Sequence, residues 1–335
     1  MDIRKLKYLF KINYAKRQYQ KKDGKGSLLF AKHISKKTKR RLCKNKNAYL
    51  TFDYLNPVKQ CTHPDIIKSS LFNKYLLTVS GYPFEIAKFE NPFLYSSENG
   101  TDFINVFGDK PIATYMGDGA SHYSDSEIIE DNGKVYLFYR MCYEDCDVPN
   151  IKIIVRSSDD LIRWSDEYEL FSKNGKSYLS PAFVKRDNKY HMYYVDLDDE
   201  KNAIYNLKRK VSNSLLFDDE PKEEVLKLNN CPQNRSIWHI DVISDGDVLR
   251  GLFVFMIGKK AEGGTRLYYA ESKDDGKTWD IGDEIMFDIN YKLVKRIYRS
   301  TMIKGENGWD IYYPVCTKND CWYLLLSKNR KLGLK

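Results

Sequence analysis

The sequence lacks any run of the ~20 apolar residues that a membrane-spanning helix requires. Residues 1–20 also lack the apolar stretch, between a basic start and a small-residue cleavage site, that marks a secretory signal peptide. From these two absences we expect a cytoplasmic protein that does not cross a membrane.

Cysteine is scarce, and its spacing does not fit a metal site. The seven cysteines include two close pairs, Cys142 with Cys146 and Cys316 with Cys321. Neither pair is flanked by the second pair of ligands that a zinc site needs. We expect reduced thiols in and between strands rather than zinc ligands.

Acidic residues are nearly absent from the first 50 residues. This segment holds 17 Lys and Arg against two acids, whereas the rest of the chain carries a net charge of −6 within a total of +9. We therefore divide the chain into a basic N-terminal extension, 1–50, and a mildly acidic domain, 51–335. The acidic balance of that domain argues against a nucleic-acid groove, so we expect no nucleic-acid partner.

The extension has apolar residues at helical spacing among its basic residues, which predicts a basic amphipathic helix. Such a helix can lie on the inner surface of an anionic membrane, or it can dock on the rest of the protein with its basic face in solvent. A second basic run, 36–41, could bind phosphate or acidic lipid, or be a solvated connector. The apolar residues of the first helix are Ile3, Leu6, Leu9, Phe10 and Tyr14.

Aromatic residues are abundant, at 14% of the chain with 26 Tyr, and one short phrase recurs five times. Each copy is a polar or small residue, two apolar residues, a turn and an aromatic-rich strand. The step between copies averages about 59 residues, which fits four antiparallel strands and is too long for a helical or leucine-rich repeat. Broad rings also favour strands. We predict an all-β fold, a five-bladed β-propeller with a short, basic, partly helical N-terminal extension. The copies begin at Asp65, Glu127, Ala182, Asp241 and Thr301.

A second motif occurs late in three of the predicted blades, at 96–103, 157–164 and 272–279. Each copy is a polar turn rich in Ser, Asp, Asn or Gly and closed by an aromatic residue. It resembles the Asp-box hairpin of sialidases and related propellers. We interpret it as a folding device, in which a carboxylate caps the turn and the ring fills the blade.

The innermost strand of each propeller blade lines the central channel, so the five repeat positions should converge on one mouth of that channel. Three of them are acidic, Asp65, Glu127 and Asp241, and three of the five histidines lie within five residues of these acids. Neighbouring carboxylates push one another's pKa values apart, as an acid/base pair requires. An acid at this position can also bond to the backbone of the next blade. We predict Asp65, Glu127, His239 and Asp241 as catalytic residues.

The residues around these acids are our candidates for substrate binding. Flat aromatic faces can stack on sugar rings, and Arg can bind hydroxyls or a carboxylate with its two-pronged guanidinium. The candidates are His63, Tyr82, His122, Tyr123, Asp125, Arg140, Ser180, Trp238 and Arg299.

Together, these motifs resemble the furanosidase-type propeller glycoside hydrolases, those of families 43, 62, 32, 68 and 117, with the phosphorolytic family 130 nearby. The resemblance rests on His63 and Asp65 at the start of blade one, an acid at the start of blade two, the Asp-box-like turns and the five blades. It covers about residues 55–330. It implies that Asp65 is the general base, that Glu127 or Asp125 tunes its pKa, and that a blade-three Glu is the general acid.

Blade three departs from this pattern, because it reads Ser180-Pro181-Ala182 with no carboxylate. The resemblance to family 117 implies that a histidine can replace the acid, and His239 is then the candidate. Loss of glycosidase activity is the other explanation.

Three functions remain open at this point. The chain is a glycoside hydrolase-like enzyme that acts on a glycan or oligosaccharide by general acid/base catalysis at the central cleft. Alternatively, it is a glycosyl-transferring or phosphorolytic propeller enzyme of intracellular polysaccharide metabolism, or a non-catalytic carbohydrate-binding propeller. We predict no cofactor, although His and Asp clustered at the channel mouth could hold a divalent cation.

Overall fold

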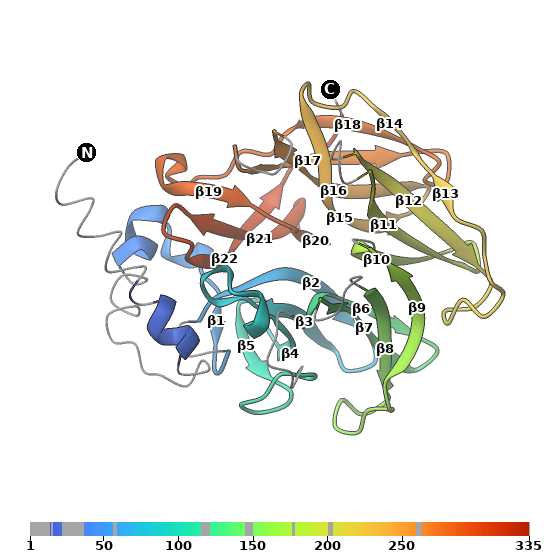
Figure 1. Ribbon diagram of the computed structural model, residues 1–335, viewed down its shortest axis with the longest axis horizontal. Coiled ribbons are helices and arrows are strands. Elements are labelled where there is room, and N and C mark those ends of the chain that lie inside the picture. Colours follow the sequence, from blue (N-terminus) through green and yellow to red (C-terminus); the bar gives the residue numbers. More distant parts are fainter. Residues whose placement is uncertain are drawn as a thin grey trace.

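Antiparallel strand pairing dominates the computed structural model, and it confirms the predicted all-β propeller. The structure describes residues 14, 16–21, 37–55, 59–114, 121–144, 150–175, 178–199, 204–258 and 263–334. Within these residues the strands form four sheets, and because the largest consists of two mainly antiparallel sheets joined at one edge, five such sheets surround a central axis (Figure 1). The last two sheets are joined by a single parallel pair, Thr265 with Arg296.

Each sheet is one blade, and its strands follow one another in the sequence from the axis outward. Blade one contains β2 (Cys61–Ser69), β3 (Lys74–Gly81), β4 (Asn91–Ser97) and β5 (Asp102–Asn105). Blade two contains β6 (His122–Asp131), β7 (Lys134–Tyr143), β8 (Asn150–Ser158) and β9 (Tyr168–Asn174). Blade three contains β10 (Leu179–Arg186), β11 (Lys189–Asp199), β12 (Ile204–Ser212) and β13 (Glu224–Val225).

Blade four contains β15 (Arg235–Asp245), β16 (Val248–Ile257), β17 (Thr265–Ser272) and β18 (Thr278–Glu284), with β14 (Lys227–Asn229) paired in parallel to its outer edge. Blade five contains β19 (Val294–Ile297), β20 (Thr301–Lys304), β21 (Trp309–Thr317) and β22 (Trp322–Arg330). Four short 3-10 helices connect these elements: η1 (Lys46–Ala48), η2 (Pro83–Glu85), η3 (Ala87–Phe89) and η4 (Tyr291–Leu293).

The chain segment just before blade one closes the ring. Tyr49 forms an antiparallel bridge to Leu325 of β22, in the last blade. Two residues later, β1 (Thr51–Phe52) pairs in parallel with β5 at the outer edge of the first blade. One short segment thus bonds to both the first and the last blade, and these contacts close the ring of blades around the central channel.

The inner strands deviate from regular pairing at the same place in every blade. The register shifts between Thr62 and Asp65, and equivalent shifts occur in β6, β10 and β15. In blade five the inner strand is interrupted between β19 and β20. His63, Asp125 and Ser180 occupy these irregular positions with φ of 47°, 47° and 48°. Bulges redirect side chains and are common beside active sites. This level of the channel is therefore where we look for a functional site.

The outer turns of the blades carry dense local hydrogen bonding. In blade four, Asp274 Oδ1 accepts from the Thr278 N–H at 2.9 Å, and the buried Trp279 donates from Nε1 to the Gly276 carbonyl at 3.1 Å. In blade two, Asp160 Oδ1 accepts from the Ile162 N–H at 2.8 Å. Gly276 is required here, because its φ is +78° and a Cβ would lie 2.2 Å from the Tyr193 hydroxyl.

Parts of the N-terminal extension are described, and they pack on the propeller. Residues 16–21 and 37–42 are helical, and Tyr19 and Leu42 are buried in the same core cluster as residues of blades four and five. Of the apolar residues of the predicted first helix, Tyr14 is helical, and the other four lie outside the described residues. Among the described helices, none has the length and apolar character to cross a membrane. The six cysteines in the described segments form no disulfide with one another.

Candidate functional site

All five blades contribute to a cavity of ≈420 Å³ at the irregular level of the inner strands. Its wall includes residues from the inner strands of blades one, two, three and four, and Tyr298 from the gap in the inner strand of blade five. The cavity therefore lies at the channel mouth. Its lining residues are His63, Tyr82, Ala87, Glu90, His122, Ser124, Asp125, Arg140, Glu144, Ile151, Leu179, Tyr205, Trp238, His239 and Tyr298.

A larger cavity of ≈700 Å³ lies elsewhere, between the N-terminal segment around Cys43–Tyr49 and blades one and five. Its wall contains no histidine, and its two carboxylates, Asp102 and Asp288, come from different parts of the fold. Titratable groups converge in the smaller cavity, so we assign the candidate site there.

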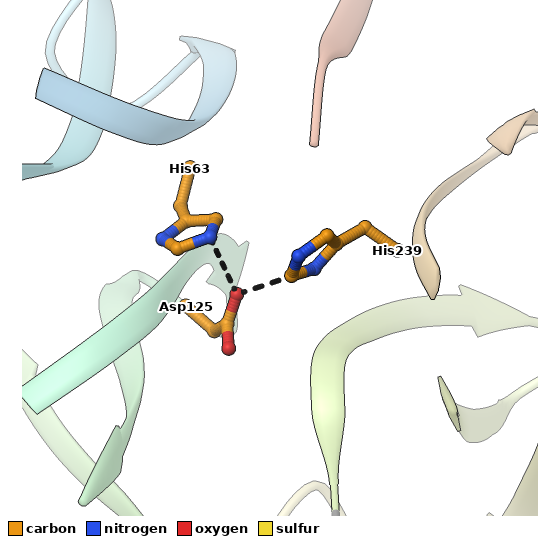
Figure 2. Close-up of side chains that lie close together, drawn as sticks. All are labelled: His63, Asp125 and His239. Atoms are coloured by element: carbon orange, nitrogen blue, oxygen red, sulfur yellow. Dashed lines mark ion pairs between the residues drawn. The ribbon is translucent and has the colours of Figure 1, made fainter. Parts of the chain in front are cut away.

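Three side chains from three blades meet in this cavity, as Figure 2 shows, and we call them the His–Asp–His cluster: His63, Asp125 and His239. Asp125 Oδ1 lies 3.3 Å from His63 Nε2 and 3.7 Å from His239 Nδ1. The other oxygen, Oδ2, accepts from Arg140 Nη1 at 3.1 Å. All three members are at most 3% exposed.

The surroundings of the cluster set its charge state. Burial alone would raise the pKa of Asp125, but its electrostatic interactions with His63, His239 and Arg140 outweigh burial and hold that pKa well below the usual range. Burial lowers the pKa of His239 well below 6.5, although Asp125 opposes the shift. At neutral pH the cluster therefore presents an ionised carboxylate beside a neutral imidazole.

Glu90 supplies a second carboxylate on the other side of His63. Its Oε1 lies 2.9 Å from His63 Nδ1, and its Oε2 lies 3.7 Å from His122 Nε2. His63 thus stands between two carboxylates, those of Glu90 and Asp125. Glu90 comes from the segment after η3, where neither the repeat nor a motif in the sequence marks it.

Ser180 occupies the blade-three position that carries no acid. Its hydroxyl contacts His239 Nδ1 and donates to Asp125 Oδ1 at 3.4 Å. The side chain is fully buried and lies behind His239, outside the lining of the cavity. Ser180 therefore contacts the catalytic candidates rather than the space where a substrate would lie.

Aromatic rings form one wall of the cavity. Trp238 Nε1 donates to the Tyr298 hydroxyl at 3.0 Å, and the Tyr298 ring lies 4.1 Å from the His239 ring between centroids. Tyr205 packs edge-on against Trp238, and Tyr82 stacks on Trp322 at 6.0 Å. Flat rings beside polar groups are the surfaces that bind sugar rings.

The predicted catalytic acids Asp65, Glu127 and Asp241 lie together in a second group that is not part of the cavity wall, and we call it the buried carboxylate cluster. Asp65 Oδ2 accepts from the Ile128 N–H at 2.7 Å, and Glu127 Oε1 accepts from the Phe183 N–H at 3.0 Å. Each bond reaches the next blade. These two carboxylates therefore bond to the backbone of the next blade, which was the alternative to a catalytic role for an acid at this position.

Arg299 lies inside the buried carboxylate cluster. Its guanidinium contacts Glu127, lies 3.8 Å from Asp241 and donates to the Ser126 carbonyl at 2.9 Å. It is fully buried and does not line the cavity. Burial raises the pKa of Asp241 to about 7, and Asp65 adds to this shift while Arg299 opposes it.

Of the predicted site residues, seven line the cavity: His63, Tyr82, His122, Asp125, Arg140, Trp238 and His239. Tyr123 instead packs in the core against Tyr139. Sequence reasoning missed Tyr205 and four other polar residues of the wall. Ser124 stands beside Asp125 in the same inner strand, a placement that could have suggested it, whereas Glu90, Glu144 and Tyr298 lie outside the repeat phrase.

The described residues offer three groups of possible metal ligands. The His–Asp–His cluster has one ligand atom from each residue, all within 4.8 Å of one another. Two imidazoles and one carboxylate form a set that binds divalent transition metals with open positions. His63 Nε2 faces Asp125 Oδ1 at 3.3 Å and has no hydrogen-bond partner among the described residues, so this set fits a metal.

The other two groups fit a metal less well. Arg299 already lies among the three acids of the buried carboxylate cluster. In the third group, Glu85, Cys316 and Asp320, the carboxylates pair with lysine and arginine side chains.

The fold and this cavity define a β-propeller whose polar, aromatic-walled site lies at the mouth of the central channel. No protein-family model matches the sequence, and no curated protein matches it either. Solved structures do match in fold. An N-acetylgalactosamine deacetylase from F. plautii, in complex with blood group B trisaccharide, aligns over 85% of this chain and 94% of its own, with 16% identity and a TM-score of 0.66.

Glycoside hydrolases of family 43 share the fold as well. A thermostable member aligns over 81% of this chain and 91% of its own, with 15% identity and a TM-score of 0.59. A member from Xanthomonas citri, in complex with xylose, aligns over 80% of this chain and 86% of its own, with 10% identity and a TM-score of 0.58. At these identities the likeness establishes the propeller fold.

Proposed function

We propose that this protein is a glycoside hydrolase-like enzyme that hydrolyses a glycan at the His–Asp–His cluster. The observation that carries the proposal is the meeting of His63, Asp125 and His239 in a ≈420 Å³ cavity with aromatic walls. Proteins of the same fold supply support, because one was solved with a trisaccharide and one with xylose.

The electrostatics suggest a role for each group. His239 is neutral at neutral pH, so its free nitrogen can take a proton from the attacking water. Asp125 stays ionised and can stabilise the positive charge that develops on the sugar ring. Glu90 and Glu144 line the same cavity and are the candidates for protonating the leaving oxygen.

This assignment moves the chemistry away from Asp65, Glu127 and Asp241. Their carboxylates lie outside the cavity wall, and two of them bond to backbone N–H groups of the next blade. We propose that they hold the inner strands together.

The test is a panel of arabinofuranosides, xylosides and N-acetylgalactosaminides, with products followed by mass spectrometry. We expect the wild-type protein to release sugar, and the His239→Gln and Asp125→Asn variants to lose about 10²- to 10⁴-fold in kcat. Glu98→Gln is the control, because that carboxylate is exposed on an outer turn. Turnover equal to wild type in both variants would remove the cluster from the mechanism.

The ligand set of the cluster favours a second candidate, the metal-assisted removal of an acyl substituent from a glycan. His63, Asp125 and His239 would hold the metal, which when bound would polarise the acyl oxygen and activate water. Glu90 would fix the orientation of His63 through its contact with Nδ1. The neighbour solved with the trisaccharide is a deacetylase, which adds support.

The two candidates give different products and different metal requirements. Enzyme dialysed against a chelator, with and without added Mn²⁺ or Zn²⁺, should be offered N-acetylated and O-acetylated glycans. Free acetate that depends on metal supports deacylation, whereas a new reducing end that forms without metal supports glycoside hydrolysis. Added phosphate tests phosphorolysis, and a ligand that binds but is recovered unchanged supports a binding module.

A further inference from the structure

The helix at residues 16–21 contacts the part of the propeller that shapes the candidate site. Tyr19 is 2% exposed and packs edge-on against two phenylalanines of one loop. Its ring centroid lies 5.8 Å from that of Phe84 and 5.0 Å from that of Phe89. We call this loop, residues 82–90, the rim loop.

The rim loop delivers three residues to the cavity wall: Tyr82, Ala87 and Glu90. Glu90 is the one whose carboxylate contacts His63 at 2.9 Å. Two phenylalanines of the loop therefore face the N-terminal helix, while the loop's ends face the His–Asp–His cluster. A shift of this loop would change the distance between Glu90 and His63.

The backbone of the rim loop is not one that would hold its shape alone. Phe84 and Glu85 are consecutive non-glycine residues in the left-handed region, with φ of 57° and 60°. Such residues persist only where the surrounding structure over-determines them. Inside the propeller, Gln60 Oε1 accepts from the Phe84 N–H at 3.0 Å.

A chain of ion pairs makes a second link between the helix and the loop. Lys16 pairs with Asp320, which in turn accepts from Lys295 Nζ at 2.6 Å. Lys295 and Arg296 both pair with Glu85 of the rim loop. The N-terminal helix thus reaches the loop through its aromatic contact and through charged side chains of blade five.

We propose that Tyr19 is a positioning residue: it holds the rim loop so that Glu90 stays against His63 and Tyr82 stays in the cavity wall. The N-terminal extension is then part of the machinery of the site rather than an appendage to the propeller. The kinetic consequence of this proposal rests on the proposed function, whereas the structural consequence does not.

Hydrogen exchange tests the structural consequence directly. In Tyr19→Ala, amides of residues 82–90 should exchange about tenfold faster, since two aromatic contacts are lost, while amides of β7 and β16 stay as in wild type. Tyr19→Phe should restore the wild-type rate because it keeps the ring. Tyr14→Ala is the matched control, because Tyr14 lies near the same helix and is 57% exposed. Tyr19→Leu keeps apolar burial and replaces Tyr19→Ala if the latter does not fold.

Kinetics on a cleaved glycan test the functional consequence. Tyr19→Ala should lower kcat about tenfold when it is measured at a temperature where the variant is still folded, with recovery in Tyr19→Phe. Unchanged exchange in the rim loop of Tyr19→Ala or Tyr19→Leu overturns the proposal whatever the activity. Faster exchange in the loop of a protein whose wild type turns over no glycan leaves the positioning role standing and overturns the proposed function instead. Faster exchange together with a wild-type kcat would show that Tyr19 holds the loop without affecting the site. That result also overturns the proposal that Tyr19 is a positioning residue.

Discussion

Asp65 on β2 accepts a hydrogen bond at 2.7 Å from the backbone N–H of Ile128 on β6, and this bond joins blade one to blade two. The same contact recurs one blade further on, where Glu127 accepts from the Phe183 N–H at 3.0 Å. The repeated acid is therefore a link between neighbouring inner strands in the first two blade interfaces.

Replacing Asp65 with Ala should destabilise the fold. The Ile128 N–H is left buried without its partner, and the loss of one partner of a buried bond costs about 1–3 kcal/mol. Urea unfolding measures the free energy of unfolding. Glu98→Ala, on an exposed side chain, should change it by less than about 0.5 kcal/mol. Equal stability of the Asp65→Ala variant and wild type would show that the bond contributes nothing.

The repeat predicted the strands and the propeller well, because aromatic and apolar residues at a fixed step are read directly from the sequence. The repeat did not show how deep in the channel the cavity lies, because the repeated acids are not the residues of its wall. The residues that reach the cavity stand two positions earlier, at His63, Asp125 and His239, whereas Asp65 and Glu127 lie behind them. Residues two apart in a strand share a face, so the sequence could place both sets on the channel side but could not rank them along its axis.

The bulges explain part of this difference. His63 and Asp125 lie in the left-handed region, and neither is a glycine, the residue that adopts a positive φ without steric cost. Glu90 was out of reach for another reason: it arrives from a loop whose path is set by the contacts of Phe84 and Phe89 with Tyr19, some 70 residues away in the chain. Such long-range placement leaves no local pattern.

The stability of the protein should carry a pH dependence from Asp241. Burial raises its folded-state pKa from 3.8 to about 7, so the folded protein keeps a proton that the unfolded chain releases. The stability that comes from this proton is fully present below pH 3.8 and is lost as the pH rises toward 7. Wild type should therefore lose stability relative to Asp241→Asn across this interval, and the difference should be constant above it.

Urea unfolding of wild type and Asp241→Asn at intervals between pH 4 and 8 measures this difference, and the contributions of carboxylates outside the buried carboxylate cluster cancel because both proteins share them. A difference that does not change with pH would mean that Asp241 is ionised in the folded protein throughout.

The enzyme should keep its activity at pH values somewhat below 6.5, the usual pKa of a histidine. In the proposed mechanism His239 is the base, a role that it can fill only when neutral, and burial lowers its pKa well below 6.5. The value of kcat/KM should therefore stay level as the pH falls through 6.5 and decline only at lower pH. A pH–rate profile at constant ionic strength measures this, with circular dichroism at each pH to show that the fold persists. An acid limb centred at or above 6.5 would contradict the assignment of His239.

Ser180 should control the tautomer of His239. Its hydroxyl donates to Asp125 Oδ1 at 3.4 Å and contacts His239 Nδ1, so the Nδ1–H can donate to Ser180 and leave the lone pair on Nε2. Ser180→Ala removes this relay, and the base is then in the correct tautomer for only part of the time. We expect kcat to fall about tenfold and the ring ¹⁵N shifts of His239 to move toward the other tautomer. Ser126→Ala is the matched control, because that hydroxyl is equally buried on an inner strand and has no hydrogen-bond partner among the described residues. Wild-type kcat together with unmoved ¹⁵N shifts in Ser180→Ala would show that Asp125 orients His239 without the serine.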